Sequence, residues 1–501
     1  MEPSTVEEFE RLVEQGFNVI PLLETLQLDR ETPVSLYQRL ADRAIFLLES
    51  AALGDATGRY SFVGLDRSWR LRAINDQVLA EGIDAPLDVS PLESLRAVMA
   101  RYRVYAPSTL PDFFGGAVGF VTYDYVRQLE SLPNQLTAVD WPTIDFSFPG
   151  VVLVIDHIRH STTIVVNVVI NENSSVSAQY EAAKSSLNAL VTDLLTDAPA
   201  VNPETERLVA LAPSKRGEFS IREMAASISN FTKEQYGRVV ERAREYIFAG
   251  DIFQVVPSQQ FKQPTSVDPL TLYRVLRALN PSPYMYLLDG GDSQIVGASP
   301  EMLMRVHAGV VSTRPIAGTR ARGANEEEDL RLEQDLLADE KEISEHVMLV
   351  DLGRNDVGRI AAPGTVRVER LAKIERFSHL MHLVSQVDGD LANDADAFDA
   401  FKAIFPAGTL TGAPKVRAME LIDEFEPVRR GPYGGAVGYF SLTGNADFAI
   451  TIRTVSLRNG FATVQAGGGV VASSTAEFEY QECINKASAP LLALAIASQI
   501  N

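Results

Sequence analysis

Two stretches far apart in the chain resemble each other: FFGGAVGFVTYDY (Phe113–Tyr125) and PYGGAVGYFSLTG (Pro432–Gly444). Each begins with paired glycines and continues as a run of β-branched and aromatic residues, which is typical of a β-strand. Two antiparallel layers built from related halves would explain the resemblance. Coincidence between two glycine-rich strand starts would explain it equally well.

Outward from the first stretch, the first 170 residues are mostly short β-rich runs separated by turn residues, such as AIFLLES from Ala44. The second half mixes strands with helical patterns. KEQYGRVVERAREYIFAGD, for example, has an apolar stripe of helical period that ends at Gly250. Strands that cluster with helices between them, without strict alternation, favour an α+β fold over a Rossmann fold.

Between the two halves, the sequence loses its periodicity and becomes rich in Pro, Glu and Ser. We therefore predict an N-terminal, mostly β region over residues 1–200, a linker over 201–220 and a second domain over 221–501. A long surface loop inside a single domain is the alternative interpretation of the linker.

Composition narrows the class of protein. The 501 residues carry 45 Lys and Arg against 66 Asp and Glu, a net charge of −21, which argues against binding nucleic acid or an anionic membrane surface. One cysteine, Cys483, excludes a disulfide framework or a cysteine-built metal site and suits a reducing compartment. The acidic N-terminus lacks the apolar core of a signal peptide. We expect a cytoplasmic enzyme.

Two pairs of glutamates are spaced three residues apart in helical segments: Glu342 with Glu345, and Glu479 with Glu482. Each pair projects from one helical face, where like charges repel unless a cation is near. Mg²⁺ prefers such carboxylate oxygens. Judged by spacing alone, solvated acidic faces are the more ordinary interpretation, with Glu482 paired to Lys486. The first of these helices is expected to bury a different stripe, formed by Ile343, Val347 and Val350.

Other chemical motifs are weak when read from the residues alone. GTLTGAPK (Gly408–Lys415) lacks the spacing of a Walker A loop, and the sequence contains no G-x-S-x-G nucleophile elbow. The glycines at 467–469 follow a strand, where they would let the backbone approach an anionic ligand. His382 lies in a mixed apolar segment, where a histidine is more often a core residue than a general base.

Taken together, the motifs resemble those of the chorismate-utilising enzymes, specifically the large synthase subunit of anthranilate synthase. The resemblance covers nearly the whole chain and is dense from about Met224 to Ile496. It is carried by PIAGTRARG, EKEISEHVMLVDLGRNDVGRI, MHLVSQV, AGTLTGAPKVRAMELI, GPYGGAVGYF, ITIRT and VQAGGGVV.

The resemblance implies a two-domain α+β fold in which antiparallel β-sheets are sandwiched between helices, with residues 221–501 binding chorismate. It also implies a Mg²⁺-dependent lyase of tryptophan biosynthesis. Ammonia adds to C2 of chorismate with loss of the C4 hydroxyl, and pyruvate is then eliminated to leave anthranilate. The metal is expected on Glu345 and Glu482, with Glu342 and Glu479 in its near shell.

Further roles follow from the same resemblance. Glu301 in GASPE matches the acid that protonates the departing hydroxyl, His382 matches the residue of pyruvate elimination, and Thr409 lies near the ring. The residues expected to hold chorismate are Gly318, Thr319, Tyr433, Arg453, Gly467, Gly468, Gly469 and Lys486. The sequence departs from the family pattern at Gly468, Ala476 and Cys483, which puts loop rigidity in doubt more than chemistry.

Two positions distinguish this chain from related activities. Isochorismate and salicylate synthases carry a water-activating lysine where this chain has Gln254, and aminodeoxychorismate synthases carry a nucleophilic lysine where it has Ala317. Both substitutions favour anthranilate. Aminodeoxychorismate synthase remains the alternative, together with a relative that releases aminodeoxyisochorismate. A non-catalytic tryptophan-sensing subunit is the alternative from another class.

The resemblance also implies a partner and a regulator. A glutaminase needs a cysteine nucleophile with a histidine partner, and Cys483 lies in the helix that carries Glu482. The ammonia source is therefore expected to be a separate glutaminase subunit, commonly in a complex with two copies of each chain. A tryptophan feedback site is expected at Glu49, Ser50, Pro283, Tyr284 and Met285.

Overall fold

The computed structural model describes residues 2–51, 56–75, 77–196, 202–376 and 380–499. Its strands pair antiparallel throughout, and most of them join in one continuous sheet that branches at β6 (Ile144–Asp156). One edge of β6 pairs with β3 (Tyr60–Ile74). The other edge pairs first with β5 (Gly116–Val121) and then with β7 (Ser161–Val169).

The two branches form two arms. From β3, the first arm runs through β2 (Ala44–Glu49), β10 (Tyr284–Asp289), β11 (Ser293–Ser299), β20 (Thr454–Arg458), β21 (Phe461–Gly467) and β9 (Ser258–Pro264). From β5, the second runs through β18 (Ala436–Ser441), β19 (Ala446–Ile450), β12 (Met302–His307), β13 (Val310–Thr313) and β16 (Leu380–Asp390), which also pairs with β14 (Ile316–Ala321) and β15 (Arg367–Arg376). In the same sheet, β1 (Val19–Leu26) pairs with β7 and β4 (Gln77–Glu81) pairs with β3. A separate two-stranded sheet consists of β17 (Gly412–Ala413) and β8 (Gln254–Val255).

Helices cover the outer faces of both arms. The α-helices are α1 (Val6–Glu14), α2 (Pro33–Arg39), α3 (Pro91–Met99), α4 (Val176–Leu194), α5 (Pro203–Leu211), α6 (Ile221–Ile228), α7 (Lys233–Ala249), α8 (Pro269–Leu279), α9 (Glu326–Ala338), α10 (Glu340–Gly358), α11 (Ala397–Ile404), α12 (Lys415–Phe425) and α13 (Ala476–Ala497). Short 3₁₀ turns are η1 (Ala56–Arg59), η2 (Tyr123–Gln128), η3 (Ala212–Gly217) and η4 (Gly408–Leu410).

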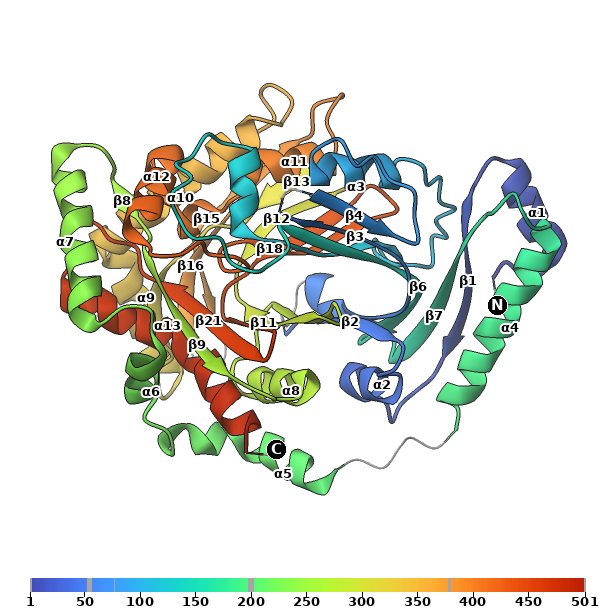
Figure 1. The fold of residues 1–501 in the computed structure, drawn as a ribbon, viewed down its shortest axis with the longest axis horizontal. Coiled ribbons are helices and arrows are strands. Elements are labelled where there is room, and N and C mark those ends of the chain that lie inside the picture. Colours follow the sequence, from blue (N-terminus) through green and yellow to red (C-terminus); the bar gives the residue numbers. More distant parts are fainter. Residues whose placement is uncertain (1, 52–55, 76, 197–201, 377–379, 500–501) are drawn as a thin grey trace.

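Three buried layers hold this arrangement together. Phe46, Phe113, Phe120, Ile295 and Val437 pack between the two arms. A second core lies under α8 and α13, and a third lies under α3 and α11. Figure 1 shows α3 and α11 above the strands and α8 and α2 below them. The expected α+β fold, with antiparallel sheets sandwiched between helices, is therefore confirmed.

The two glycine-rich stretches that resemble each other become neighbouring strands. β5 and β18 pair antiparallel, with Gly119 opposite Gly438. A Cβ at Gly119 would lie 1.9 Å from the Asp145 carbonyl oxygen, and one at Gly438 would lie 2.0 Å from that of Asp447. The two positions therefore require glycine for the same reason, which is the close approach of the next strand's backbone.

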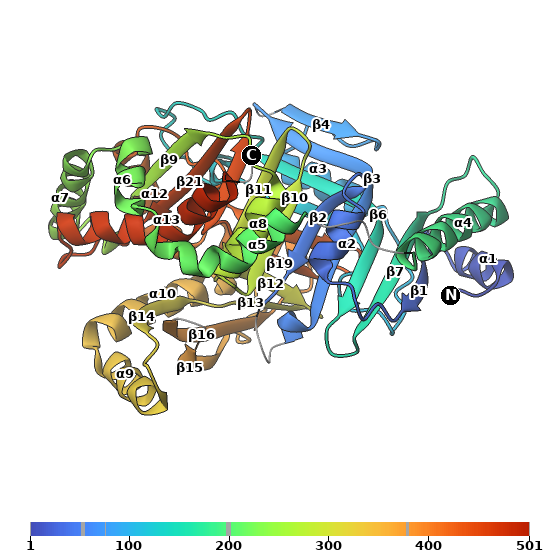
Figure 2. The ribbon, with the colours of Figure 1, turned by 90° about the horizontal axis from the view of Figure 1, so that it is seen from below.

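The region expected to be a linker contains α5 and η3, and both pack against α8. β2 and β3 from the N-terminal region share one sheet arm with strands from the second half. The boundaries at 200 and 220 remain a prediction. Figure 2 shows β14, β15, β16, α9 and α10 at one end of the molecule, away from α1 and α4 at the other.

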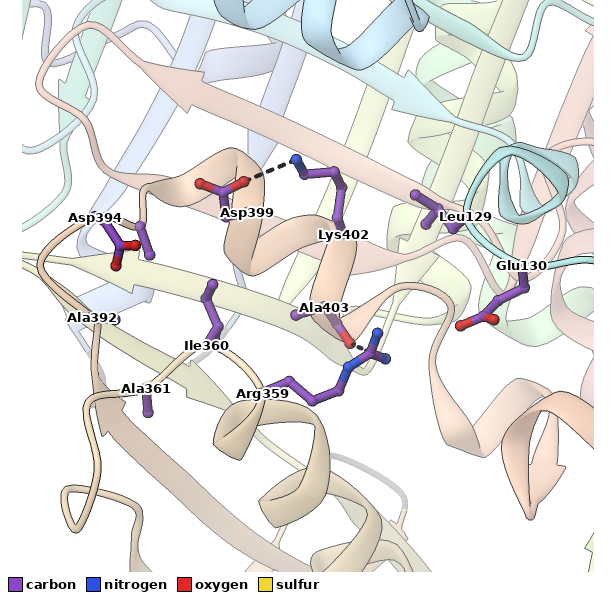
Figure 3. Close-up of a pocket in the computed structure, with 11 residues that line it drawn as sticks. Leu129, Glu130, Arg359, Ile360, Ala361, Ala392, Asp394, Asp399, Lys402 and Ala403 are labelled. Carbon is purple, nitrogen blue, oxygen red and sulfur yellow. Dashed lines mark hydrogen bonds and ion pairs between the residues drawn. The ribbon is translucent and has the colours of Figure 1, made fainter.

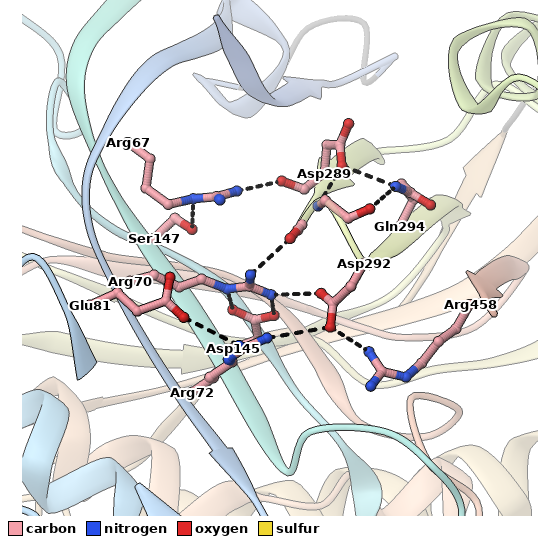
Figure 4. A network of polar contacts seen from close by, with 12 residues as sticks. Arg67, Arg70, Arg72, Glu81, Asp145, Ser147, Asp289, Asp292, Gln294 and Arg458 are labelled. Atoms are coloured by element: carbon pink, nitrogen blue, oxygen red, sulfur yellow. Dashed lines mark hydrogen bonds and ion pairs between the residues drawn. The ribbon is translucent and has the colours of Figure 1, made fainter. Parts of the chain in front are cut away.

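A network of charged side chains also joins the two halves (Figure 4). The buried Arg70 guanidinium donates to Asp145 Oδ1 at 2.8 Å, to the Gly290 carbonyl at 2.8 Å and to Asp292 Oδ1 at 3.2 Å. Arg458, at the end of β20, donates to the other oxygen of Asp292 at 3.1 Å. The turn between β10 and β11 is thus bound to β3 and to β20.

Candidate active site

Glu301 lies between β11 and β12, and its side chain is buried. The Thr409 hydroxyl, on η4, donates to Glu301 Oε1 at 2.9 Å. Burial raises the pKa of Glu301 to about 7, although the Thr409 hydrogen bond and the charges of Lys486 and Arg453 act in the opposite direction. A carboxyl with this pKa is protonated in a large share of molecules at neutral pH, so it can act as a general acid.

His382 lies on β16, directly opposite Thr319 on β14. Its Nδ1 is 3.2 Å from the Gly318 carbonyl oxygen and 3.0 Å from Thr319 Oγ1. A carbonyl can only accept, so we assign the ring proton to Nδ1, which leaves Nε2 as the nitrogen able to take a proton. Burial lowers the pKa of His382, which keeps the imidazole in this neutral form.

Gly318 brings the β14 strand against the helix that carries the first glutamate pair. Its φ is +65°, and a Cβ there would lie 2.9 Å from Leu383 Cδ1 and 3.3 Å from Glu342 Oε2. A side chain at this position would therefore be strained and would press on Glu342. The glycine allows strand and carboxylate to approach each other.

Arg453 has a left-handed backbone, with φ at +52°. Such a conformation is uncommon for a long side chain and is typical of functional sites. Its carbonyl accepts a hydrogen bond from Ala298 N at 3.2 Å. Burial lowers the pKa of Arg453, while the charges of Glu482 and Glu301 act on it in the opposite direction. The guanidinium is therefore close to both the acid and the second glutamate pair. Tyr433 is likewise buried within reach of this charge.

On α13, Lys486 Nζ lies 2.5 Å from Glu482 Oε1 and donates to the Gly467 carbonyl at 3.1 Å. The ordinary i, i+4 ion pair expected for Glu482 is therefore present. Glu479 is almost fully buried, and burial raises its pKa to about 7, with Glu482 adding to the shift. Its Oε2 has no hydrogen-bond partner among the described residues.

The glycines at 467–469 lie between the two glutamate pairs. A Cβ at Gly468 would lie 2.6 Å from Glu479 Oε2, and one at Gly469 would lie 2.4 Å from Gln254 Nε2. The same Gln254 amide donates to Glu345 Oε1 at 3.1 Å. Gln254 therefore connects the glycine segment 467–469 to Glu345 on α10.

α10 begins where the Asp339 side chain accepts from the backbone N–H groups of Lys341 and Glu342. Burial raises the pKa of Glu342, and the nearby Glu345 adds to the shift. Within the residues that the structure describes, no three His, Cys, Asp or Glu side chains come together closely enough to hold a metal ion. Glu342 lies near Glu345 and Glu479 near Glu482, but the two pairs do not form a finished metal centre among the described residues.

The residues expected to bind tryptophan lie close together where β2 ends and β10 begins. Glu49 lies opposite Met285, and Met285 lies opposite Ala298 on β11, whose N–H reaches Arg453. Glu49 accepts from the Tyr273 hydroxyl at 2.5 Å and from Arg277 at 3.1 Å.

The remaining members of this group lie close by. The Ala51 N–H, next to Ser50, donates to the carbonyl of Ser282, next to Pro283, at 3.0 Å. Tyr284 points to the opposite face of the sheet from Met285, and its hydroxyl donates to Asp447 at 3.0 Å. The five positions are therefore neighbours, with side chains on two faces.

Several buried polar residues near the site were not predicted. His346 is fully buried on α10, and its Nε2 lies 2.6 Å from Ser385 Oγ. Asp356 is also buried and bound to Lys415 at 2.7 Å. Their only signal in the sequence was their place inside the long motifs of the resemblance.

The fold and this site define a class of protein. A family model described as chorismate binding enzyme matches residues 44–492, and the chain belongs to that family. It is 44% identical to anthranilate synthase component 1 of Acetivibrio thermocellus over 98% of both chains. It is 47% identical to that of Mycolicibacterium smegmatis, over all of this chain and 95% of the relative. The crystal structure of anthranilate synthase component I from Streptococcus pneumoniae superposes with a TM-score of 0.70 at 38% identity, covering 88% of this chain and 94% of that one.

Within the described part of the chain, no helix combines the length and apolar character needed to cross a bilayer.

Proposed function

We propose that the chain is the synthase subunit of an anthranilate synthase, which converts chorismate and ammonia to anthranilate and pyruvate in tryptophan biosynthesis. The observation that carries the proposal is the buried Glu301, bound to Thr409 and with a pKa raised to about 7. Loss of a hydroxyl needs a proton donor at that oxygen, and an ordinary carboxyl would be ionised at neutral pH.

In the first half-reaction, the planar Arg453 guanidinium binds a substrate carboxylate, for which its fork geometry is suited. The backbone at residues 467–469 and the side chains of Tyr433 and Lys486 hold the rest of the substrate. Glu301 then donates its proton to the C4 oxygen while ammonia bonds to C2. Gln254 and Ala317 offer no amine that could compete with ammonia.

In the second half-reaction, pyruvate leaves and the ring becomes aromatic. This step requires loss of the proton at C2. The neutral His382, with its proton held on Nδ1 by Gly318, is suited to accept that proton at Nε2. The Thr319 hydroxyl also contacts Nδ1 of His382 and helps to orient the imidazole.

We propose Mg²⁺ as the cofactor, held by Glu345 and Glu482, with Glu342 and Glu479 nearby. The donor set fits, since all four offer carboxylate oxygens, and Glu479 Oε2 is buried without a hydrogen-bond partner among the described residues. When bound, the cation neutralises the substrate carboxylates, which these glutamates would otherwise repel. The Lys486 ammonium beside Glu482 supplies part of that positive charge.

We propose that the ammonia comes from a separate glutaminase subunit in the cytoplasm, in a heterotetramer with two copies of each chain. Cys483 is the only cysteine. Burial raises the pKa of its thiol to about 11, and the thiol donates to the Tyr236 hydroxyl at 3.0 Å. Such a buried thiol is a poor nucleophile, so the glutaminase reaction has to take place on another chain.

We also propose that tryptophan inhibits the enzyme by binding at Glu49, Ser50, Pro283, Tyr284 and Met285. The proposal is supported by the proximity of these five residues, which lie where β2 ends and β10 begins. Glu49 offers a carboxylate for the amino group of tryptophan, and Met285 an apolar contact for the indole.

The test is product identification. The chain is incubated with chorismate, Mg²⁺ and an ammonium salt, with and without tryptophan, and the products are separated and identified. We expect the fluorescent ortho-amino acid anthranilate, formed more slowly with tryptophan. Aminodeoxychorismate, whose amino group is para to the ring carboxylate, or aminodeoxyisochorismate alone, would assign the chain to a related activity. No product with intact chorismate would favour a non-catalytic sensor.

A further inference from the structure

A small cavity of about 30 Å³ lies beside Glu301. Glu301 and Thr409, joined by their hydrogen bond, line it, and so does Asp356 of α10. The space exceeds the roughly 10–15 Å³ that one water molecule needs, and two carboxyl groups and a hydroxyl offer it polar partners. The cavity is therefore suited to hold one water between Glu301 and Asp356.

Asp356 belongs to a buried ion pair. Lys415 Nζ donates to Asp356 Oδ2 at 2.7 Å and to the Ile404 carbonyl at 3.0 Å. The two side chains are only 6% and 12% exposed. Taking two charges out of water is expensive, and apolar side chains of similar size would often stabilise a core as well. Burial raises the pKa of Asp356 and lowers that of Lys415, so their charged and neutral forms lie closer in energy than in water.

A second, open hollow of about 540 Å³ lies on the surface (Figure 3). Arg359, which follows α10, lines this hollow and donates to the Ala403 carbonyl at 3.4 Å. Ala403 precedes Ile404, which binds Lys415. Arg359 and Glu130, which also lines the hollow, both act electrostatically on Lys415. Asp356 thus lines the small cavity, while Lys415 is linked through Ile404 to the wall of the surface hollow.

We propose that Lys415, Asp356 and a water in this cavity form a relay that returns a proton to Glu301 after each turnover. The inference rests on the proposed function, because it needs Glu301 to act as the acid. Asp356 and Lys415 do not touch the substrate and act only through Glu301.

The proton balance of the relay is complete. Glu301 gives its proton to the C4 oxygen, the C–O bond breaks with its electrons on oxygen, and water leaves. The Lys415 ammonium then gives a proton to the Asp356 carboxylate, Asp356 gives one to the cavity water, and the water gives one to the Glu301 carboxylate. Lys415, whose side chain is 12% exposed, regains a proton from bulk water. The nitrogen bonded to C2 releases its extra proton to solvent, and every group of the chain returns to its starting form.

The test is rapid-quench kinetics with Asp356→Asn, an isosteric change that cannot pass a proton in the same way. Below pH 7, most Glu301 side chains are protonated before substrate binds, so under these conditions we expect the first turnover to keep the wild-type rate and later turnovers to slow by about ten-fold or more. Asp356→Glu keeps a carboxyl group at this position, so its later turnovers should run at close to the wild-type rate. A merely structural role would slow the first and later turnovers together, and that result, or wild-type rates throughout, would overturn the relay.

Two further measurements keep the proposal falsifiable if Asp356→Asn does not fold. Lys415→Arg keeps the cation but holds its proton far more tightly, so it should also slow only the later turnovers. A high-resolution crystal structure of the unmutated chain should show a water within hydrogen-bond distance of Glu301 and Asp356, and an empty cavity would contradict the relay. Glu301→Gln is the separate check on the proposed function, since wild-type first turnover in that variant would mean that Glu301 is not the acid.

Discussion

Thr409 and Glu301 come from segments more than one hundred residues apart, yet the hydroxyl of one binds the carboxyl of the other at 2.9 Å. The bond fixes which carboxyl oxygen remains for the substrate. The proposed catalytic acid is thus oriented by a side chain whose own backbone belongs to the short turn η4.

Glu301→Gln tests the acid and its ionisation. With rates expressed per unprotonated ammonia, wild-type activity should fall as pH rises above about 7, because the acid loses its proton, while Glu301→Gln should be inactive at every pH. Thr409→Val should keep the acid but lower the rate. A rate that stays level well above pH 7 would contradict the raised pKa.

The raised pKa of Glu301 should also make the free energy of unfolding depend on pH. Between pH 4.5 and about 7, the unfolded chain releases a proton that folded Glu301 keeps, so the free energy of unfolding falls as pH rises through this window. The loss is complete above about pH 7 and amounts to about 3 kcal/mol. Denaturant titrations at pH 5 and pH 8 should therefore show Glu301→Gln gaining stability relative to wild type at the higher pH. An equal difference at both values would mean an ordinary pKa.

Glu482→Gln should lower kcat/KM by about a hundred-fold or more at limiting Mg²⁺, with the fold intact, because it removes charge from the proposed metal shell. Glu477→Gln is the matched control, since Glu477 lies on the same helix but its exposed side chain pairs with Lys233. The measurement is the initial rate against Mg²⁺ concentration. Similar curves for both variants would rule out Glu482 as a ligand.

His382→Ala should separate the half-reactions. Chorismate should still be consumed, while anthranilate formation falls by about 10² to 10⁴ and aminodeoxyisochorismate accumulates. Chromatography of quenched reactions measures both products. His307→Ala is the control, because His307 is exposed and pairs with Asp112 outside the site. Anthranilate at the wild-type rate would make His382 a core residue.

Ser50→Phe should leave ammonia-dependent synthesis intact and raise the tryptophan concentration needed for half-inhibition by about ten-fold or more. The phenyl ring would occupy the volume proposed for tryptophan. By reciprocity, chorismate with Mg²⁺ should weaken tryptophan binding to the unmutated chain, as measured by calorimetry. Ser174→Phe, in an exposed turn, should behave as wild type. Unchanged inhibition in Ser50→Phe would move the regulatory site elsewhere.

The layered fold could be predicted because its signals are local. Alternating runs, turn residues and the two glycine-rich strands each indicate a strand, and β5 and β18 did prove to be neighbours. Which strand joins which arm could not be predicted, since β2 pairs with β10 across more than two hundred residues.

Helix α10 shows where residue patterns alone fail. The stripe Ile343, Val347 and Val350 was expected to be buried, but Val347 is 43% exposed and His346 is fully buried instead. The inward face of this helix meets a polar site, so its buried members include a histidine and an aspartate. Their partners, Ser385 and Lys415, lie 39 and 59 residues away, beyond the reach of any periodicity.

The glutamate pairs teach a related lesson. Spacing placed each pair on one helical face but could not distinguish solvent from ligand. The burial of Glu479 depends on Gly468, whose missing side chain leaves room for the carboxylate. Only the resemblance carried by the long motifs placed both this glycine, which follows β21, and the acid on α13 at one site.

Glu49 pairs with Met285, Met285 pairs with Ala298, and Ala298 donates to the Arg453 carbonyl. These contacts across neighbouring strands link the proposed tryptophan site to the proposed substrate site. Side chains alternate between faces along a strand, so a one-residue slip of β10 would move Met285 from the α8 core into the layer between the arms. The register of β10 is therefore strongly specified by the two faces it packs against. Ala298 pairs with Met285 and donates to the Arg453 carbonyl, so a substitution there should disturb both the proposed tryptophan site and the proposed substrate site without touching either ligand.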